Sequence, residues 1–229
     1  MNQLLTTGII LSRTDYGEAD RIITLLTPEQ GKLRLMARGV RKVKSKLAGG
    51  IELFSVSDIT YIRGKGEIGT LISARLNQHY GNIIRQLARV QLGYELIKIL
   101  NKATEDHPEA EYFHLLEQGF AALNDELVDL QLIRTWFEAQ LLKLGGHTPN
   151  LLTDSTGHRL SATQLFDFEF NEMMFSPRLE GKFSASHVKL LRLLFSDNLP
   201  GQLANVEGVG KLLPHVVPLV QTILATYIS

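Results

Sequence analysis

The first 78 residues contain short apolar or alternating runs that are typical of β-strands. In the run that begins at Lys32, Leu33, Leu35 and Ala37 fall on one side and the intervening, mostly basic side chains on the other. That pattern is typical of a strand with one buried face. Turn signals separate it from similar runs at Gly8–Arg13, Arg21–Thr27, Ile51–Arg63 and Glu67–Leu76. Five short strands predict a small closed barrel, for which the OB-fold is the commonest five-stranded architecture.

Helical spacing replaces this alternation from residue 79 onward. Apolar residues recur every three or four positions within His79–Thr104, which predicts a first long helix. Start signals in Asp106–Pro108 predict a second helix. Asn124-Asp125 predicts the start of a third, which would include Leu127 and end at Gly145-Gly146. Short connections between the three helices predict a bundle-like body.

Residues 147–183 lack a sustained period. A short strand is expected at Phe166–Phe170, and two more helices are expected near residues 184–197 and 208–228. The predicted fold class is therefore α+β. An N-terminal five-stranded OB barrel in residues 1–78 precedes an α-helical domain in residues 79–229, which includes an irregular lobe at about residues 147–187.

The chain contains no cysteine, which excludes disulfides, cysteine-ligated zinc and thiol catalysis. Its N-terminus shows no basic segment followed by an apolar run, and no stretch of about 18 apolar residues occurs. We therefore expect neither a secretory signal nor a membrane span, and we expect a cytoplasmic protein.

Charge is distributed unevenly along the chain. Residues 1–80 carry 12 lysines and arginines against 7 acidic residues, whereas residues 81–229 carry 12 against 17. Seven of the 15 residues in Lys32–Lys46 are basic and none is acidic. Cations on a strand face, continued by a basic loop after Gly39, suit the phosphates of a nucleic-acid backbone. The candidate DNA-binding residues are Lys32, Arg34, Arg38, Arg41, Lys42, Lys44 and Lys46, with Lys65 at the next hairpin tip as an extension.

Single-strand binders also offer aromatic surfaces to unstacked bases. Tyr16, Phe54 and Tyr61 are candidates for that role, and each is equally compatible with the barrel core. The basic segment has its own alternative interpretation, a solvated loop that keeps an edge strand soluble. The uniform sign of its charge favours nucleic-acid contact over that alternative.

Three stretches in the first 76 residues resemble the N-terminal domain of the RecO family of recombination mediator proteins. They are GIILSRTDYGEADRIITLLTPEQGKLRLMARGVRK at 8–42, SKLAGGIELFS at 45–55 and the GKG-x-x-GTL hairpin at 64–71. The helical part matches more loosely, through Phe137-Glu138, Leu141-Leu142, Gly146 and Pro149.

This resemblance implies an OB-fold followed by a helical body, and a cytoplasmic, nucleoid-associated protein of bacteria. It also implies binding of single- and double-stranded DNA, annealing of complementary strands, and action on strands coated with single-stranded DNA-binding protein. The acidic-apolar tail of that protein docks on the helical body of family members. With RecR, they help to load the RecA recombinase. These activities make and break no bond, so we expect no catalytic residue and no cofactor.

The same resemblance exposes a departure. Many members of the family carry two Cys-x-x-Cys pairs that hold a structural zinc, and the matching positions here are Thr153, Thr156, Ser184 and His187. Three hydroxyls and one imidazole are not a zinc ligand set. We therefore expect no metal, and we expect packing around Phe166–Phe170 to hold the lobe together.

Two smaller groups of charged residues are further candidates. Asp15, Glu18 and Asp20 have no further acidic neighbours along the chain with which to build a nuclease site. Arg134 and Lys143 are candidate contacts for an acidic-apolar peptide tail, because a basic residue beside an apolar groove suits such a ligand. The alternative for both is an ordinary exposed helix charge.

The sequence as a whole predicts a DNA-binding recombination mediator. Two alternatives stay open, because OB barrels host many functions. One is a scaffold that binds only proteins, and the other is an RNA-binding OB protein without annealing activity.

Overall fold

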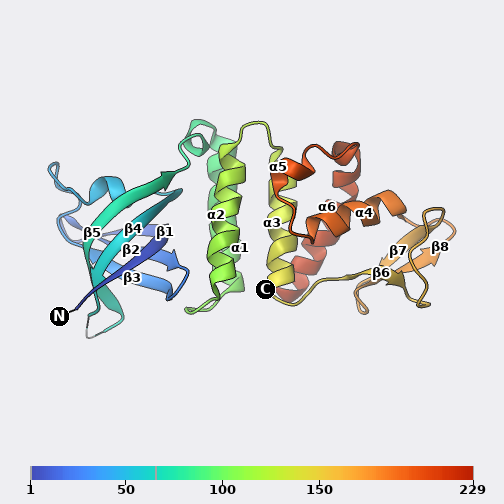
Figure 1. Cartoon of the computed structure of the whole chain (residues 1–229), viewed down its shortest axis with the longest axis horizontal. Coiled ribbons are helices and arrows are strands. Elements are labelled where there is room, and N and C mark those ends of the chain that lie inside the picture. The colour runs from blue at the N-terminus through green and yellow to red at the C-terminus, as the bar shows by residue number, and fades with distance from the viewer. Residues whose placement is uncertain (1, 65, 229) are drawn as a thin grey trace. The chain divides into compact units, whose positions relative to one another are not determined.

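The computed structural model describes residues 2–64 and 66–228. The chain forms two compact units, Met1–Asp125 and Glu126–Ser229. The first contains a barrel and two helices, and the second contains the remaining helices and a small sheet (Figure 1). The two packing units divide after Asp125, whereas the expected domain boundary lies at residue 78. That domain boundary stays a prediction.

Five strands close the N-terminal barrel in the order β1-β2-β3-β5-β4. They are β1 (Gln3–Tyr16), β2 (Asp20–Thr27), β3 (Gly31–Ala37), β4 (Ser55–Ile62) and β5 (Ile68–His79). β1 pairs antiparallel with β2 and with β4, and β3 pairs parallel with β5. This closed five-stranded order is that of an OB-fold, so the predicted architecture is confirmed.

The interior of the barrel is filled by the residues that the period-two pattern assigns to one face. Ile23 and Leu25 of β2 lie opposite Leu35 and Leu33 of β3. Ile23, Leu25 and Leu35 are at most 1% exposed. Each fully buried aliphatic side chain of this kind stabilises the fold by about 1.5–3 kcal/mol. The intervening residues of both strands therefore face away from the barrel interior, and one of them, Leu26, is nevertheless fully buried.

Helices α1 (Leu87–Ala103) and α2 (Ala110–Asn124) lie side by side and pack on the barrel (Figure 1). Phe54 fixes this contact, because its ring is 2% exposed and lies edge-on to Phe120 at 5.3 Å between centroids. Gly93 of α1 makes room for the ring, since a Cβ there would lie 2.6 Å from it. Phe54 has a φ of 56°, which costs a non-glycine residue roughly 1–3 kcal/mol. Packing must supply that energy.

The first helix begins later than predicted. β5 continues through His79, and a 3-10 turn at Ile83–Arg85 precedes the start of α1 at Leu87. Ile83 is fully buried but Leu87 is 73% exposed, so the two residues have helical spacing in the sequence without sharing a buried face. The second helix likewise starts at Ala110, after its predicted start signals.

The helices of the second unit are α3 (Leu130–Leu144), α4 (Ala185–Leu194), α5 (Pro200–Leu203) and α6 (Val209–Tyr227). The side chain of Asp129 caps α3 by accepting a hydrogen bond of 2.9 Å from the amide of Leu132. Trp136 is 1% exposed, and its Nε1 donates to the carbonyl oxygen of Asn198 at 2.8 Å. Leu127 precedes α3 and is 93% exposed, so its predicted place inside the helix was wrong.

The segment between α3 and α4 is more regular than predicted. β6 (Asn150–Asp154), β7 (Leu165–Glu169), β8 (Met174–Arg178) and β9 (Phe183–Ser184) form a sheet in the order β6-β8-β7-β9. The expected strand at Phe166–Phe170 is β7. The other strands were missed because five residues or fewer give too few alternations to recognise.

Phenylalanines form the core of this lobe, as predicted. Phe166 and Phe175 are fully buried, with ring centroids 6.2 Å apart in an edge-to-face arrangement. Phe168 lies 5.1 Å from Phe175 in the same manner. Phe170 is the exception in the predicted run, because it is 44% exposed.

Helix α6 meets the length and hydropathy criteria of a membrane span, with 19 residues and a mean hydropathy of 1.3. The apolar pattern of the sequence did not indicate a span of this kind. The helix packs against α3 and α4, and Val216, Val220 and Ile223 are buried. The core helix of a globular unit has the same composition.

Candidate nucleic-acid interface

The basic segment begins on the outer face of β3. Arg34 is exposed there, beside Thr24 of β2. Its guanidinium lies 3.7 Å from the carboxylate of Glu67, whose side chain is 88% exposed. An ion pair between two exposed groups contributes about 0–1 kcal/mol. Arg34 is therefore readily available to a phosphate.

We call residues 38–46, which follow β3, the basic loop. Two apolar residues attach this loop to the barrel core. Val40 is 4% exposed and belongs to the barrel core, and Leu47 packs against the same core from the other end. After Leu47 the backbone approaches β5 so closely that a Cβ on Gly50 would lie 2.3 Å from the carbonyl oxygen of Ala74. The loop is thereby fixed at both ends, while none of residues 41–46 is buried.

The turn between β1 and β2 supports the basic loop. Oδ1 of Asp20 accepts a hydrogen bond of 2.7 Å from the amide of Gly39. Gly39 has a φ of 64°, a conformation that glycine adopts without steric cost. Further on, the amide of Arg41 donates to the carbonyl oxygen of Ala19 at 3.0 Å.

Asp15 adds a second support. Its carboxylate accepts a hydrogen bond of 2.7 Å from Arg21 and lies 3.5 Å from the guanidinium of Arg41. The hydrogen bond from Arg21 lowers the pKa of Asp15, with further lowering from the charge of Arg41. The acidic residues of this region thus hold the basic loop in place, a role that the sequence analysis missed because they precede the loop by some twenty residues.

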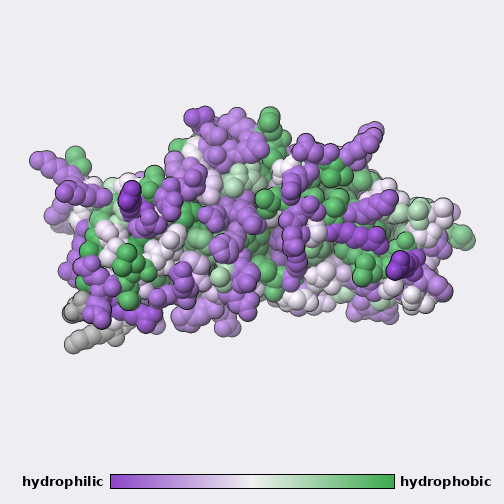
Figure 2. All heavy atoms as spheres, viewed as in Figure 1, coloured by the Kyte–Doolittle hydropathy of each residue, from purple (hydrophilic) through white to green (hydrophobic). Residues whose placement is uncertain are grey.

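Four cations of the basic loop remain uncommitted. The side chains of Arg38, Lys42, Lys44 and Lys46 are exposed and make no hydrogen bond or ion pair with the part of the chain that the structure describes. Figure 2 shows hydrophilic side chains projecting from this corner of the barrel. Such cations are neutralised only by mobile counterions or by a bound polyanion.

Lys32 has a different environment from the other cations of the segment. Its amine donates to the carbonyl oxygens of Thr104 at 3.0 Å and Asn101 at 3.4 Å, at the C-terminal end of α1. A cation is favoured at that end of a helix. Partial burial lowers the pKa of Lys32, and its backbone amide donates to Asp106 at 2.8 Å. Lys32 therefore helps to hold the helix pair on the barrel, and its contact with DNA stays a prediction.

The remaining candidates for DNA contact in the barrel are Lys65 and three aromatic residues. Lys65 lies outside the described residues, and its contribution stays a prediction. Tyr16 is 56% exposed at the end of β1, so it is accessible to a base. Phe54 and Tyr61 are at most 2% exposed, and the hydroxyl of Tyr61 donates to Oε1 of Gln30 at 2.9 Å. The suggestion that these two rings stack on bases was wrong, because they belong to the core.

The two cations proposed for a peptide tail have acidic partners within the second unit. Arg134 donates from Nε to Glu138 at 3.0 Å, and the Glu138 side chain is only 2% exposed. Lys143 lies 2.7 Å from Asp197, and its hydrogen bond lowers the pKa of that carboxyl. A peptide carboxylate would have to compete with these pairs, so the assignment stays a prediction.

Sequence comparison decides the family. The family description "Recombination protein O N terminal" matches residues 1–80, and "Recombination protein O C terminal" matches residues 84–222. This chain belongs to the recombination protein O (RecO) family. The junction between the two matches falls just after β5 and before α1, close to the boundary expected from the sequence.

Several curated RecO proteins are similar to this chain. "DNA repair protein RecO" of Dehalococcoides mccartyi is 31% identical over 202 residues, which cover 85% of this chain and 79% of the relative. That of Desulfatibacillum aliphaticivorans is 35% identical over 156 residues, covering 66% and 60%. One from Listeria monocytogenes is 30% identical over 207 residues, covering 87% and 80%.

Two of the four positions that the resemblance matched to zinc ligands, Thr153 and Thr156, lie in or near β6. The hydroxyl of Thr153 accepts a hydrogen bond of 2.8 Å from Asn150. The hydroxyl of Thr156 donates to Oδ1 of Asp154 at 2.6 Å. The same carboxylate oxygen accepts from the amides of Thr156 and His158, at 2.9 and 3.0 Å. These bonds lower the pKa of Asp154, so a carboxylate organises the turn.

The other two positions form the N-terminal cap of α4. Nδ1 of His187 accepts a hydrogen bond of 2.9 Å from the amide of Ser184, and the Ser184 hydroxyl completes a capping box. A ring nitrogen that accepts this bond cannot also hold a metal, and neutral hydroxyls are poor zinc ligands. The residues do not fit the zinc of other RecO proteins, and the described residues contain no group of three or more metal-ligating side chains.

Proposed function

We propose that this RecO-family protein binds single- and double-stranded DNA through its basic loop and acts as a recombination mediator in DNA repair. One observation carries the proposal. Arg38, Lys42, Lys44 and Lys46 are exposed on a loop that is anchored at both ends, and their side chains have no partner in the described part of the chain. A charged loop that served only solubility would need neither the anchors nor a uniform sign.

Counterion release supplies the binding energy in this proposal. For single strands, the logarithm of the binding constant falls with the logarithm of salt concentration by about 0.7 for each phosphate neutralised. Arg34 and the four uncommitted cations of the basic loop together predict a slope of about −3 to −4. In this proposal Tyr16, which is exposed at the end of β1, stacks on an unpaired base, and such stacking typically contributes about 1–3 kcal/mol.

Annealing follows from the same neutralisation. Two complementary strands repel each other through their phosphates, and cations bound along one strand lower that repulsion as the second approaches. No bond is made or broken in this step, so the proposed role is non-catalytic and needs no cofactor. The family further suggests action on strands coated with single-stranded DNA-binding protein, together with RecR and a RecA-type recombinase, in the bacterial cytoplasm at the nucleoid.

Fluorescence anisotropy of a labelled single-stranded oligonucleotide at several salt concentrations tests the proposal. The variant is Arg38→Glu/Lys42→Glu/Lys44→Glu, because none of the three side chains has a partner in the described fold. We expect at least a hundredfold loss of affinity and a shallower salt slope. The matched control Lys98→Glu/Lys189→Glu/Lys211→Glu makes the same change in charge at exposed positions outside the loop, and it should bind nearly as well as wild type.

The other outcomes separate the alternatives. Weak binding of wild type that does not depend on salt would indicate a protein scaffold. A preference for RNA over DNA of equal length would indicate a reader of the 2′-hydroxyl. Equal losses in the variant and in the control would show that net charge, rather than the basic loop, determines binding.

A further inference from the structure

Strand β7 has an unpaired edge in the second unit. β8 pairs with all of Leu165–Glu169 on one side, but β9 reaches only Leu165 and Phe166 on the other. The chain that enters β9 does not continue along the edge. Gly181 lies against the backbone of Phe166, where a Cβ would be 2.4 Å from its nitrogen. Asp167–Glu169 therefore has no strand partner on this edge among the described residues.

Helix α6 presents an uncharged ridge toward the unpaired edge of β7. Pro214, Pro218, Thr222 and Thr226 follow one another at intervals of four residues, so they share one face of the helix. Thr222 donates its hydroxyl to the carbonyl oxygen of Pro218 at 2.7 Å, and Thr226 donates to Thr222 at 2.8 Å. With both hydroxyls bonded to the helix backbone, this face offers proline rings and methyl groups.

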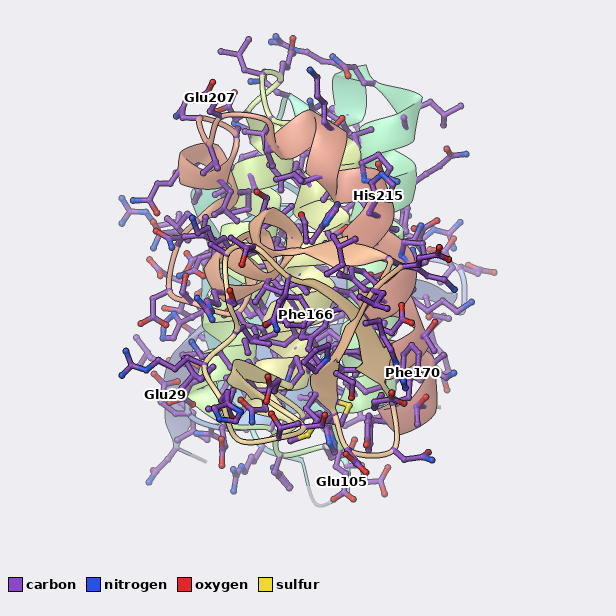
Figure 3. All side chains as sticks on the ribbon, turned by 90° about the vertical axis from the view of Figure 1, so that its right-hand side faces the viewer. Glu29, Glu105, Phe166, Phe170, Glu207 and His215 are labelled. Carbon is purple, nitrogen blue, oxygen red and sulfur yellow. The ribbon has the colours of Figure 1, made fainter. Side chains whose placement is uncertain are left out.

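A groove separates the free edge from this ridge. One recess, of about 830 Å³, is lined by Asp167–Phe170 of the sheet and by Pro214, Pro218 and Thr222 of α6. A second, of about 350 Å³, continues past Phe170 and Thr222 to Thr226 and Tyr227. Figure 3 looks onto this side, where His215 and Phe170 both lie along α6 and Phe166 lies further into the sheet. The two recesses share Phe170 and Thr222, so they form one groove.

The charges along the groove largely cancel. Arg178 pairs with Glu169 at 3.1 Å, and Asp167 accepts a hydrogen bond from the backbone amide of Lys182. The lining also contains the side chain of Lys182, whose charge is opposite to that of Asp167, and the side chains of His215 and Tyr227. The ring of His215 lies 5.0 Å from that of His187. A lining with this balance favours an occupant of little net charge, in contrast to the basic loop.

We propose that this groove binds an extended, uncharged segment of a partner protein by strand addition to β7. The backbone groups of Asp167–Glu169 that point away from β8 would pair with the incoming strand, and alternate apolar side chains would face Phe170 and the ridge of α6. The ridge from Pro214 to Thr226 is about 18 Å long, which matches five or six extended residues. The inference does not depend on DNA binding.

The proline ridge contributes to recognition as well as to shape. Pro218 has no N–H, so the carbonyl oxygen of Pro214 lacks its usual helical donor. A donor on an occupant of the groove can satisfy this acceptor. An extended peptide has N–H groups on both of its edges, so one edge can pair with β7 while the other donates to the carbonyl oxygen of Pro214. A purely apolar ligand can do neither.

A phage-displayed library of random nine-residue peptides, selected on the whole chain, tests the proposal. Peptides are first depleted on the variant Thr222→Arg, whose side chain would fill the groove. We expect enrichment of neutral sequences in which apolar and polar residues alternate. A synthetic copy of an enriched peptide should lose at least tenfold in affinity against Thr222→Arg, and little against Ala225→Arg, an exposed position on the same helix outside the lining.

Backbone pairing gives the second measurement. Methylation of alternate amide nitrogens along one edge of the peptide removes its donors and should abolish binding, while methylation along the other edge should cost much less. The proposal fails if no peptide distinguishes wild type from Thr222→Arg, or if both methylated forms bind equally. It also fails if the enriched peptides are acidic and bind in a salt-dependent manner. None of these outcomes bears on the oligonucleotide experiment, so the two proposals stand or fall separately.

Discussion

The carboxylate of Asp20 and the amide of Gly39 are joined by a hydrogen bond of 2.7 Å, which ties the start of the basic loop to the β1–β2 turn. The bond is charge-assisted, and bonds of that kind contribute about 1.5–3 kcal/mol when protected from water. It connects the first residue of β2 to the loop that follows β3, so it sets the position of the loop relative to the strands.

Replacement of Asp20 by alanine should loosen the loop without unfolding the barrel. We expect trypsin to cleave the Asp20→Ala variant between residues 38 and 46 several times faster than wild type, because local opening exposes the basic sites. Mass spectrometry of timed digests measures this. The control is Asp58→Ala on β4, whose side chain makes a single hydrogen bond in the described chain, a long one of 3.4 Å from Asn77. Equal cleavage rates in both variants would show that Val40 and Leu47 alone position the loop.

Replacement of Gly31 by alanine should separate the helix pair from the barrel. Gly31 has a φ of 65°, and a Cβ there would lie 2.5 Å from the carbonyl oxygen of Asp106. Gly17 has a φ of 57° but no atom within 4 Å. We therefore expect Gly17→Ala to cost about 1 kcal/mol of unfolding free energy from backbone strain alone, and Gly31→Ala at least about 2 kcal/mol. Urea unfolding followed by circular dichroism compares them, and equal costs would mean that the contact relaxes freely.

Lys32 and Arg34 should differ in what their removal changes. Lys32→Met should lower stability by about 1 kcal/mol, because two carbonyl oxygens of α1 lose their donor, and should leave the salt slope of DNA binding almost unchanged. Arg34→Met should leave stability within about 0.5 kcal/mol and reduce the salt slope by about 0.7. Urea unfolding and anisotropy titrations measure the two quantities. If Lys32→Met reduces the slope as much as Arg34→Met, then Lys32 contacts DNA in spite of its bonds to α1.

His187 should make the second unit sensitive to acid. Burial, together with the neighbouring His215, lowers the pKa of His187 below its ordinary value of 6.5. The unfolded state therefore binds the proton more readily, and stability is lost as the pH falls from about 6.5 toward the lowered folded value. Protonation also removes the acceptor that Nδ1 offers to Ser184.

Trp136 provides the measurement, since it is the single tryptophan and lies buried in the second unit. Urea unfolding followed by its fluorescence should show a midpoint that falls between pH 7.5 and 5.5. His187→Gln should flatten that dependence, because glutamine completes a capping box without titrating. His79→Gln, at an exposed position of β5, should keep the wild-type dependence. A His187→Gln variant with the same pH profile as wild type would contradict the assignment.

The barrel could be predicted from sequence because its strands are long enough to show several alternations. The seven residues of β3 place Leu33, Leu35 and Ala37 on one face without ambiguity. The small sheet could not be predicted in the same way, because β6 pairs with β8 only at Asn150 and Asp154 and β9 has two residues. Contacts distant in sequence, such as those of Gly181 with Phe166, create these strands.

The cations of the candidate site were visible in the sequence, but their individual roles were not. A run of like charge identifies the segment that contains both Lys32 and Lys44. It does not show that one amine is bonded to the end of α1 while the other is uncommitted. Likewise, nothing in the spacing of Phe54 distinguishes a ring exposed to bases from one buried against Gly93. Those assignments depend on which surface of the barrel the helices cover.

The anchoring of the basic loop at Val40 and Leu47 also has an evolutionary consequence. The six residues between Arg41 and Lys46 contribute no buried side chain, so they can be exchanged with little effect on the stability of the barrel. Such a segment can vary in charge and length from one species to another while the fold stays constant. Affinity for a polyanion is then adjustable in small steps, and selection can match it to the salt and the competing proteins of a particular cell.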